Sequence, residues 1–192
     1  MRMVDVGYRQ LNEADDPTCS QLIAALLHCL DELAGVLEFA GDAKYVQHPV
    51  GVISGSLGVH VRHCLDHFET LLHLASNCEV NYDHRDRGTP IETDRCAALR
   101  RVAELKRELS RLAGLAPDQA VRFRGMITAD GEAIEAASSV ARELAFVLSH
   151  TIHHNAIIAS ICRKLNIPLP ARFGYAPATS AHLAATGSSG HD

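Results

Sequence analysis

The sequence predicts an all-α fold: a four-helix bundle with room for one small hairpin between the third and fourth helices. Four segments carry apolar side chains at spacings of three and four residues, the pattern of amphipathic helices. The chain has 192 residues, enough for one domain around one core. Its 47% apolar and 21% charged residues are ordinary for a globular protein. We therefore expect one domain over residues 1–170 and a partly disordered C-terminal extension over residues 171–192.

The first two predicted helices carry clear apolar stripes. The first covers residues 17–40, with Asp16 as its cap and Pro17 at its first position, and it ends before Gly41. The second covers residues 54–76, where apolar side chains alternate at spacings of four and three. Such a seam must be buried against other helices.

The second half of the chain predicts two more helices and the hairpin. The third helix covers residues 94–115 and has a strongly charged face that we expect to be solvated. Residues 121–127 alternate weakly, and the Asp-Gly pair at 130–131 is a turn signal, so a small hairpin is expected there. The fourth helix covers residues 139–165, is long and very apolar, and begins at a pair of serines that can cap it.

Charge and composition exclude several classes of function. The net charge is -5, from 18 basic and 23 acidic residues, and the basic residues form no cluster. Nucleic-acid partners are therefore not expected. The N-terminus lacks the apolar core of a signal peptide, and no uninterrupted apolar run reaches the ~18 residues of a membrane span, so we expect a cytoplasmic protein without a membrane partner. The six cysteines form no C-x-x-C pair and are expected to be free, buried thiols.

Histidine is the unusual component of the sequence, with 12 residues, and it concentrates on two of the predicted helices. On the fourth helix, His150 and His154 lie one turn apart on the apolar face, close enough for both rings to reach one metal ion. His153 falls to the side of this pair and is expected at the rim, within reach of a substrate.

The second helix carries His60, His63 and His67 beside its apolar seam. One of them could supply a third nitrogen, and periodicity alone slightly favours His60 or His67. Lone histidines on apolar faces are more often hydrogen-bonded core residues, but several buried imidazoles without partners would be costly. The Glu-x-x-His motifs of di-iron bundles and the H-E-x-x-H motif are both absent, which leaves a single ion bound by histidines.

Two motifs resemble the DinB-like (YfiT-type) metalloproteins, which are four-helix bundles. These motifs are S-L-G-V-H-V-R-H-C-L-D-H-F at residues 56–68 and H-T-I-H-H at residues 150–154. In that family one ligand comes from the second helix and an H-x-x-x-H pair from the fourth. The resemblance therefore implies His63, His150 and His154 as metal ligands, with His63 in place of the neighbours that periodicity favours.

The resemblance also implies an activity, because similar proteins include thiol S-transferases and a thiol-dependent isomerase. Three neutral imidazoles would leave Zn, Ni, Fe or Mn with an open position, where a small-molecule thiol could be activated. His60, His67 and His153 are then candidates for positioning or proton handling. The alternatives are a non-catalytic, stress-related metal protein and a metal-free helical dimerisation module, since the apolar first and fourth helices would allow a homodimer.

Two further features near the predicted site carry charge. Glu143 lies on the same stripe as His150 but two turns away, so we expect a second-sphere or interhelix partner rather than a ligand. The loop at residues 81–87 could recognise an anionic substrate through Asp83, Arg85 and Arg87, or could be held by its own ion pairs.

Overall fold

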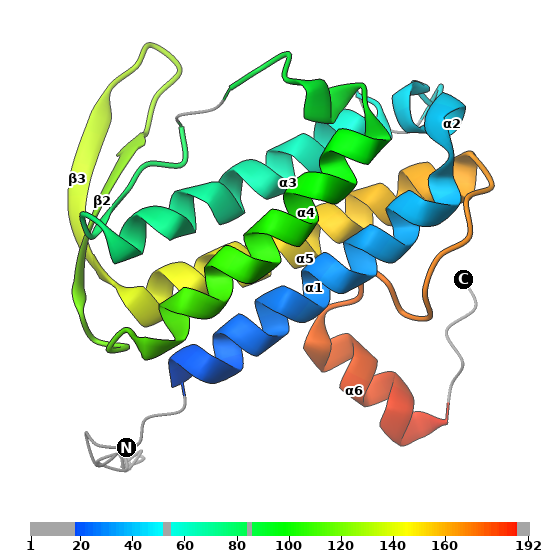
Figure 1. The fold of residues 1–192 in the computed structure, drawn as a ribbon. Helices are drawn as coiled ribbons and strands as arrows, with labels where there is room; N and C mark the ends of the chain where they lie inside the picture. The colour runs from blue at the N-terminus through cyan, green and yellow to red at the C-terminus, as the bar shows by residue number, and fades with distance from the viewer. Residues whose placement is uncertain (1–17, 52–54, 84–85, 188–192) are drawn as a thin grey trace, which may run out of the picture.

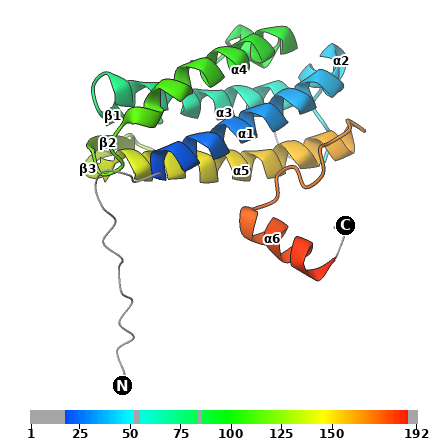
Figure 2. The same cartoon turned by 60° about the horizontal axis from the view of Figure 1, so that its bottom comes forward.

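The computed structural model describes residues 18–51, 55–83 and 86–187. Four long helices form the framework of this region: α1 (Thr18–Ala40), α3 (Leu57–Leu72), α4 (Arg95–Leu109) and α5 (Val140–Lys164). Both α1 and α3 pack against α4 and α5, so each long helix has two long neighbours (Figure 1). The turned view in Figure 2 shows the four helices again running alongside one another. The site-bearing helices α3 and α5 are therefore direct neighbours.

The predicted helix positions agree with the observed ones to within about four residues, except at the end of α4, which stops at Leu109 and is followed by a 3₁₀ helix over Ser110–Gly114, whereas the prediction ran to residue 115. Side-chain caps explain three of the starts. Ser56 accepts a hydrogen bond from the backbone N–H of Val59 at the start of α3, and Asp94 accepts one from Cys96 at the start of α4. Ser139 caps α5 as expected, accepting from Arg142. The predicted cap of α1, Asp16, lies outside the described residues.

The remaining elements are short, and three of them form a sheet. They are α2 (Asp42–Val46), η1 (His73–Ala75), β1 (Glu79–Val80), η2 (Pro90–Glu92), η3 (Ser110–Gly114), β2 (Ala120–Met126), β3 (Ala133–Ser139) and α6 (Pro177–Thr186). The strand order is β1-β2-β3, with β1 parallel to β2 and β2 antiparallel to β3. The predicted hairpin is present as β2 and β3.

The fold class needs correction in one respect, because the chain is mostly helical and not all-α. The sequence pattern showed no sign of β1, since a strand of two residues is too short to show an alternating pattern. It also gave no sign of α6, which begins at Pro177 inside the predicted C-terminal extension. The last five residues of that extension, 188–192, lie outside the described region.

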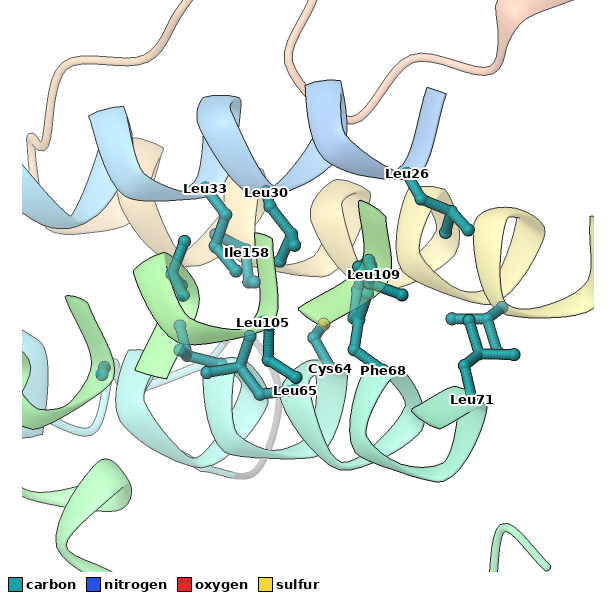
Figure 3. Packing of buried hydrophobic residues seen from close by; sticks show 14 of the residues in the cluster. Leu26, Leu30, Leu33, Cys64, Leu65, Phe68, Leu71, Leu105, Leu109 and Ile158 are labelled. Carbon is teal, nitrogen blue, oxygen red and sulfur yellow. The ribbon is translucent and has the colours of Figure 1, made fainter. Parts of the chain in front are cut away.

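The core is formed by apolar side chains between the long helices (Figure 3). Leu26, Leu30 and Leu33 of α1 face Cys64, Leu65 and Phe68 of α3, with Leu105 and Leu109 of α4 between them. The core also includes Phe173, which follows the predicted domain boundary at residue 170. Gly174 has a φ of 77°, and a Cβ atom there would lie 2.7 Å from the carbonyl oxygen of Asn155. The segment after α5 therefore lies directly against that helix.

The beginning of α3 is fixed against η2 by a close contact and by ion pairs. A Cβ atom on Gly58 would lie 2.1 Å from the carbonyl oxygen of Glu92, so only glycine allows this approach. The buried guanidinium of Arg62 binds Glu92 at 2.9 Å and Asp66 at 2.7 Å. These contacts hold the helix that carries three of the candidate histidines.

Of the helices in the described regions, α5 alone is long and apolar enough to cross a membrane, as judged by its length and composition. In the fold it packs against α1 and α3, and its apolar side chains contribute to the core. Core helices of this length meet the same criterion. The sequence prediction of no membrane partner stays a prediction.

All six cysteines are free thiols, as expected, but the expectation that all are buried is wrong for two of them. Four are buried, Cys78 is half-buried, and Cys96 is exposed. Burial raises the pKa of Cys29 to about 11, with a smaller contribution from Glu32, and raises the pKa of Cys162 to about 12. These two thiols are therefore protonated near neutral pH and are poor nucleophiles.

Candidate metal centre

The candidate site is built where α3 and α5 face each other. The spacing of His60, His63 and His67 places all three on one side of α3. His150 and His154 lie one turn apart on α5 and face α3. Helix α3 thus contributes three imidazoles, and α5 contributes two, to the contact between these two helices.

The three residues that the family resemblance selects come together. One ring nitrogen from each of His63, His150 and His154 lies within 4.8 Å of the other two. The Nε2 atoms of His63 and His150 are 3.2 Å apart, although 87 positions separate these residues in the chain. The ring of His154 lies 4.4 Å from that of His63 and 4.6 Å from that of His150, measured between centroids.

The nitrogen spacing suits coordination of one small divalent ion. With metal–nitrogen bonds of about 2.0–2.1 Å, two ligands of a tetrahedral ion lie about 3.3 Å apart. The His63–His150 pair, at 3.2 Å, already has this spacing. Nitrogens nearer the 4.8 Å limit would be brought in by a rotation of the ring.

His154 supplies the strongest indication that these residues suit a bound cation. Its Nδ1 atom is fully buried and has no hydrogen-bond partner among the described residues, which is costly for a polar atom in a folded protein. Burial, and then the neighbouring His150 and His60, lower the pKa of His154 to about 3. The ring is therefore neutral near pH 7, as a metal ligand must be. The residues present fit a bound cation.

The three candidate positioning histidines occupy different places. His67 is buried; its ring stacks on that of His150 at 3.9 Å and 19°, and its Nδ1 atom contacts the carbonyl oxygen of His63 at 2.9 Å. His60 is also buried, with its ring 6.0 Å from that of His154. His153 is exposed and contacts the edge of the His154 ring at 5.4 Å, so it lies at the rim as expected.

Two aromatic residues that the sequence reasoning missed complete the surroundings. Tyr82 stacks on His67 at 5.2 Å and 12°, and Phe146 lies 5.8 Å from His150. Phe146 could have been found, since it precedes His150 by one helical turn. Tyr82 lies in a loop, and no periodic signal marked it. Together these rings form an apolar wall on one side of the histidines.

Glu143 holds this aromatic wall in place. It does not belong to the candidate metal-ligand group found among the described residues. The carboxylate is completely buried and accepts hydrogen bonds from Tyr82 at 2.7 Å, from Arg142 at 2.8 Å and from the Ser138 hydroxyl. Burial, and then the charge of Glu143, raise the pKa of Tyr82, so its hydroxyl remains a donor. Glu143 thus joins α5 to β3 and to the loop after β1, and not to another helix through these bonds, and it is linked to the site through Tyr82 and His67.

The charged loop after α3 is tied to the hairpin. Asp83 accepts a hydrogen bond from the backbone N–H of Met126, at the end of β2. Asp83 also lines a cleft of about 510 Å³ together with Arg124. Arg87 is exposed, and Arg85 lies outside the described residues. Recognition of an anionic substrate by this loop stays a prediction, and one of its three residues has a structural role.

Comparisons with known proteins add little to this geometry. No protein-family model and no solved structure matches the chain. A curated protein, FK506-binding protein 5 of Rhizopus delemar, is 36% identical over 105 residues. The match covers 54% of this chain and 27% of that protein, so the chain spans a minor part of its curated relative.

Proposed function

We propose that this chain binds one divalent metal ion through His63, His150 and His154, and that its four long helices are the bundle of a DinB-like protein. The observation that carries this proposal is the 3.2 Å approach of the His63 and His150 Nε2 atoms. The buried, unpartnered Nδ1 atom of His154 supports it. Family membership rests on the two histidine motifs and on this convergence.

The donor set narrows the choice of metal. Three imidazoles suit zinc, nickel, iron or manganese better than calcium or magnesium, which prefer oxygen ligands. Neutral ligands leave the full charge of the ion in place. Three protein ligands are typical of sites that keep a further position open for water or substrate. FK506 binding is not proposed, because the match to the Rhizopus protein covers only 27% of that protein.

We further propose that the site activates a small thiol for transfer to an electrophilic carbon. A bound divalent ion lowers the pKa of a thiol that it coordinates, so that a thiolate is present near neutral pH. The thiol is proposed to come from outside, because the candidate ligand group among the described residues contains no cysteine, and burial raises the pKa of Cys29 and Cys162 far above neutral. In the transfer, the sulfur–carbon bond forms as the bond from that carbon to its leaving group, or to the epoxide oxygen, breaks, and we assign the exposed His153 to pass the thiol proton to solvent.

A non-catalytic role is the second candidate, favoured by the position of the site between two helices. An ion bound by His63 from α3 and by His150 and His154 from α5 would connect segments far apart in the sequence. Binding to the folded state alone stabilises it, whether or not a reaction follows. Thermal stability would then rise with metal while no thiol is consumed.

The metal proposal is tested by elemental analysis of the purified chain after loading with zinc and dialysis. We expect bound zinc in the wild type and its loss in the His63→Ala, His150→Ala and His154→Ala variants. His73→Ala is the matched control, because His73 is exposed on η1 away from the cluster. Retention of stoichiometric zinc by all three variants, each shown to be folded by circular dichroism, would refute the ligand assignment.

The catalytic proposal is tested with the metal-loaded protein and a panel of thiols, using an aromatic halide and an epoxide as electrophiles. Thiol consumption should require metal and should be lost in His150→Ala. If the wild type binds metal but consumes no thiol with any metal of the proposed set, the non-catalytic role is favoured.

A further inference from the structure

The outer edge of β3 is the surface from which we draw a further inference. Among the described residues, β3 pairs with β2 on one side and with no strand on the other. It is the outermost strand in Figure 1. Residues 133–137 are exposed, and the strand contains a single charge and no proline. Open edges of this length invite pairing with another strand unless they are blocked.

The register of the hairpin shows which backbone groups face the open side. Hydrogen bonds run from Val140 N–H to Gln119 C=O and from Ile127 N–H to Glu132 C=O, just beyond the two ends of the ladder. Hydrogen-bonded pairs alternate along an antiparallel ladder. Residues 134, 136 and 138 therefore bond to β2, and residues 133, 135, 137 and 139 direct their N–H and C=O groups outward.

The hairpin also exposes apolar side chains. Met126, Ile127 and Ile134 are exposed by 54%, 55% and 42%, and they are three of the six large apolar side chains exposed in the described chain. A solvated hairpin would carry polar residues at such positions. The sequence analysis based its expected homodimer on a different surface, the apolar first and fourth helices.

We propose that β3 pairs antiparallel with β3 of a second copy of this chain, about a two-fold axis at Ala136. The two three-stranded sheets then form one sheet of six strands. In this register Glu135 lies opposite Ala137 of the second copy, and Ala133 lies opposite Ser139. All seven residues of the strand are paired, and the four outward-facing residues of each copy form the hydrogen-bonded pairs.

Charge selects this register over its nearest alternative. An axis at Glu135 would place two carboxylates directly opposite each other, which destabilises a strand pair. An axis at Ala137 would pair only five residues of each strand. With the axis at Ala136, Glu135 has Arg124 of its own β2 on one side. On the other side, beyond the small side chain of Ala137, lies Arg122 of the second copy.

The charge argument is tested by sedimentation equilibrium on the full chain with matched substitutions at one exposed position. We expect a dimer whose dissociation constant rises about tenfold or more in Ala137→Glu, which faces Glu135, and falls in Ala137→Lys. Combining Ala137→Glu with Glu135→Lys should restore the dimer. A wild type that stays monomeric at about 0.1 mM, or a dimer indifferent to both substitutions, would overturn the proposal.

Crosslinking tests the register itself, in a Cys96→Ser background that removes the exposed thiol. Ala136→Cys places two thiols opposite each other in a non-hydrogen-bonded pair, where Cβ atoms are close enough for a disulfide. Mild oxidation should give a covalent dimer with Ala136→Cys and none with the control Ala133→Cys. Equal crosslinking of both variants would exclude this register, and pairing with a different protein instead of a second copy would leave both variants uncrosslinked.

Discussion

Replacing His67 with alanine should weaken zinc binding by about ten- to a hundredfold, although His67 is not proposed as a ligand. The His67 ring lies between those of Tyr82 and His150, at 5.2 and 3.9 Å, and nearly parallel to both. Its Nδ1 atom contacts the carbonyl oxygen of His63. One side chain therefore touches two of the three proposed ligands and limits how the His150 ring can turn.

The magnitude follows from the contacts that the substitution removes. Each stacked aromatic pair contributes about 0.5–1.5 kcal/mol, so losing two costs about 1–3 kcal/mol. If that energy holds the His150 ring in its binding orientation, losing it lowers the metal affinity by about the ten- to hundredfold given above. His67→Phe keeps both ring contacts and loses only the nitrogen. We expect it to recover most of the affinity.

The assay is competition for zinc against a chromophoric chelator, with the spectrum of the cobalt-substituted protein as a second readout. Cobalt absorption reports the geometry of the site, which a general loss of stability would not change in the folded fraction. His73→Ala again serves as the control. If His67→Ala binds zinc as tightly as the wild type, the stack does not position His150. If the wild type itself binds no zinc, the metal proposal fails first.

Three further predictions concern packing, buried polar groups and thiols. Gly58→Ala should lower the free energy of unfolding by about 3 kcal/mol or more, because the new Cβ atom would meet a backbone carbonyl at 2.1 Å. Gly35→Ala, where a Cβ atom would have nothing within 4 Å, should instead stabilise α1 by about 0.5–1 kcal/mol, and urea unfolding measures both effects. Tyr82→Phe should cost about 1–3 kcal/mol in the same assay, since it removes a donor from a buried carboxylate, and an unchanged midpoint would contradict this. Cys96, which is exposed, should be alkylated at pH 8 in the native protein, while Cys29, whose pKa is raised by burial to about 11, should react only after unfolding. Because this pKa lies above the ordinary value of 9.0, the contribution of Cys29 to stability is present below pH 9 and is lost as the pH rises toward 11.

Local patterns in the sequence identified the parts of the fold that depend on neighbouring residues. The four long helices follow from apolar spacing, and Ser139 caps α5 because its side chain serves residues immediately after it. The hairpin follows from an alternating strand and an Asp-Gly turn. The elements that were missed either are too short to show a period, as β1 is, or occur in a segment of small residues, as α6 does.

The candidate site was predictable only in part, because a helical wheel describes one helix at a time. The wheel identified His150 and His154 as facing the core, but on α3 it slightly favoured His60 or His67. Which histidine of α3 meets the pair depends on the axial offset and the crossing of the two helices, and the structure brings His63 to that place. The resemblance to DinB-like proteins had selected the same residue.

The sequence by itself determined the helical periods, the caps, the hairpin turn and the presence of an i, i+4 histidine pair, because each depends on interactions within a few residues. Only the tertiary structure decided that His63 lies 3.2 Å from His150, that Tyr82 stacks on His67, and that Glu143 is buried under Tyr82. It also decided that, within the part of the chain that the structure describes, β3 is left with an open edge. These contacts join residues that are far apart in the chain, and they arise only once the helices have packed.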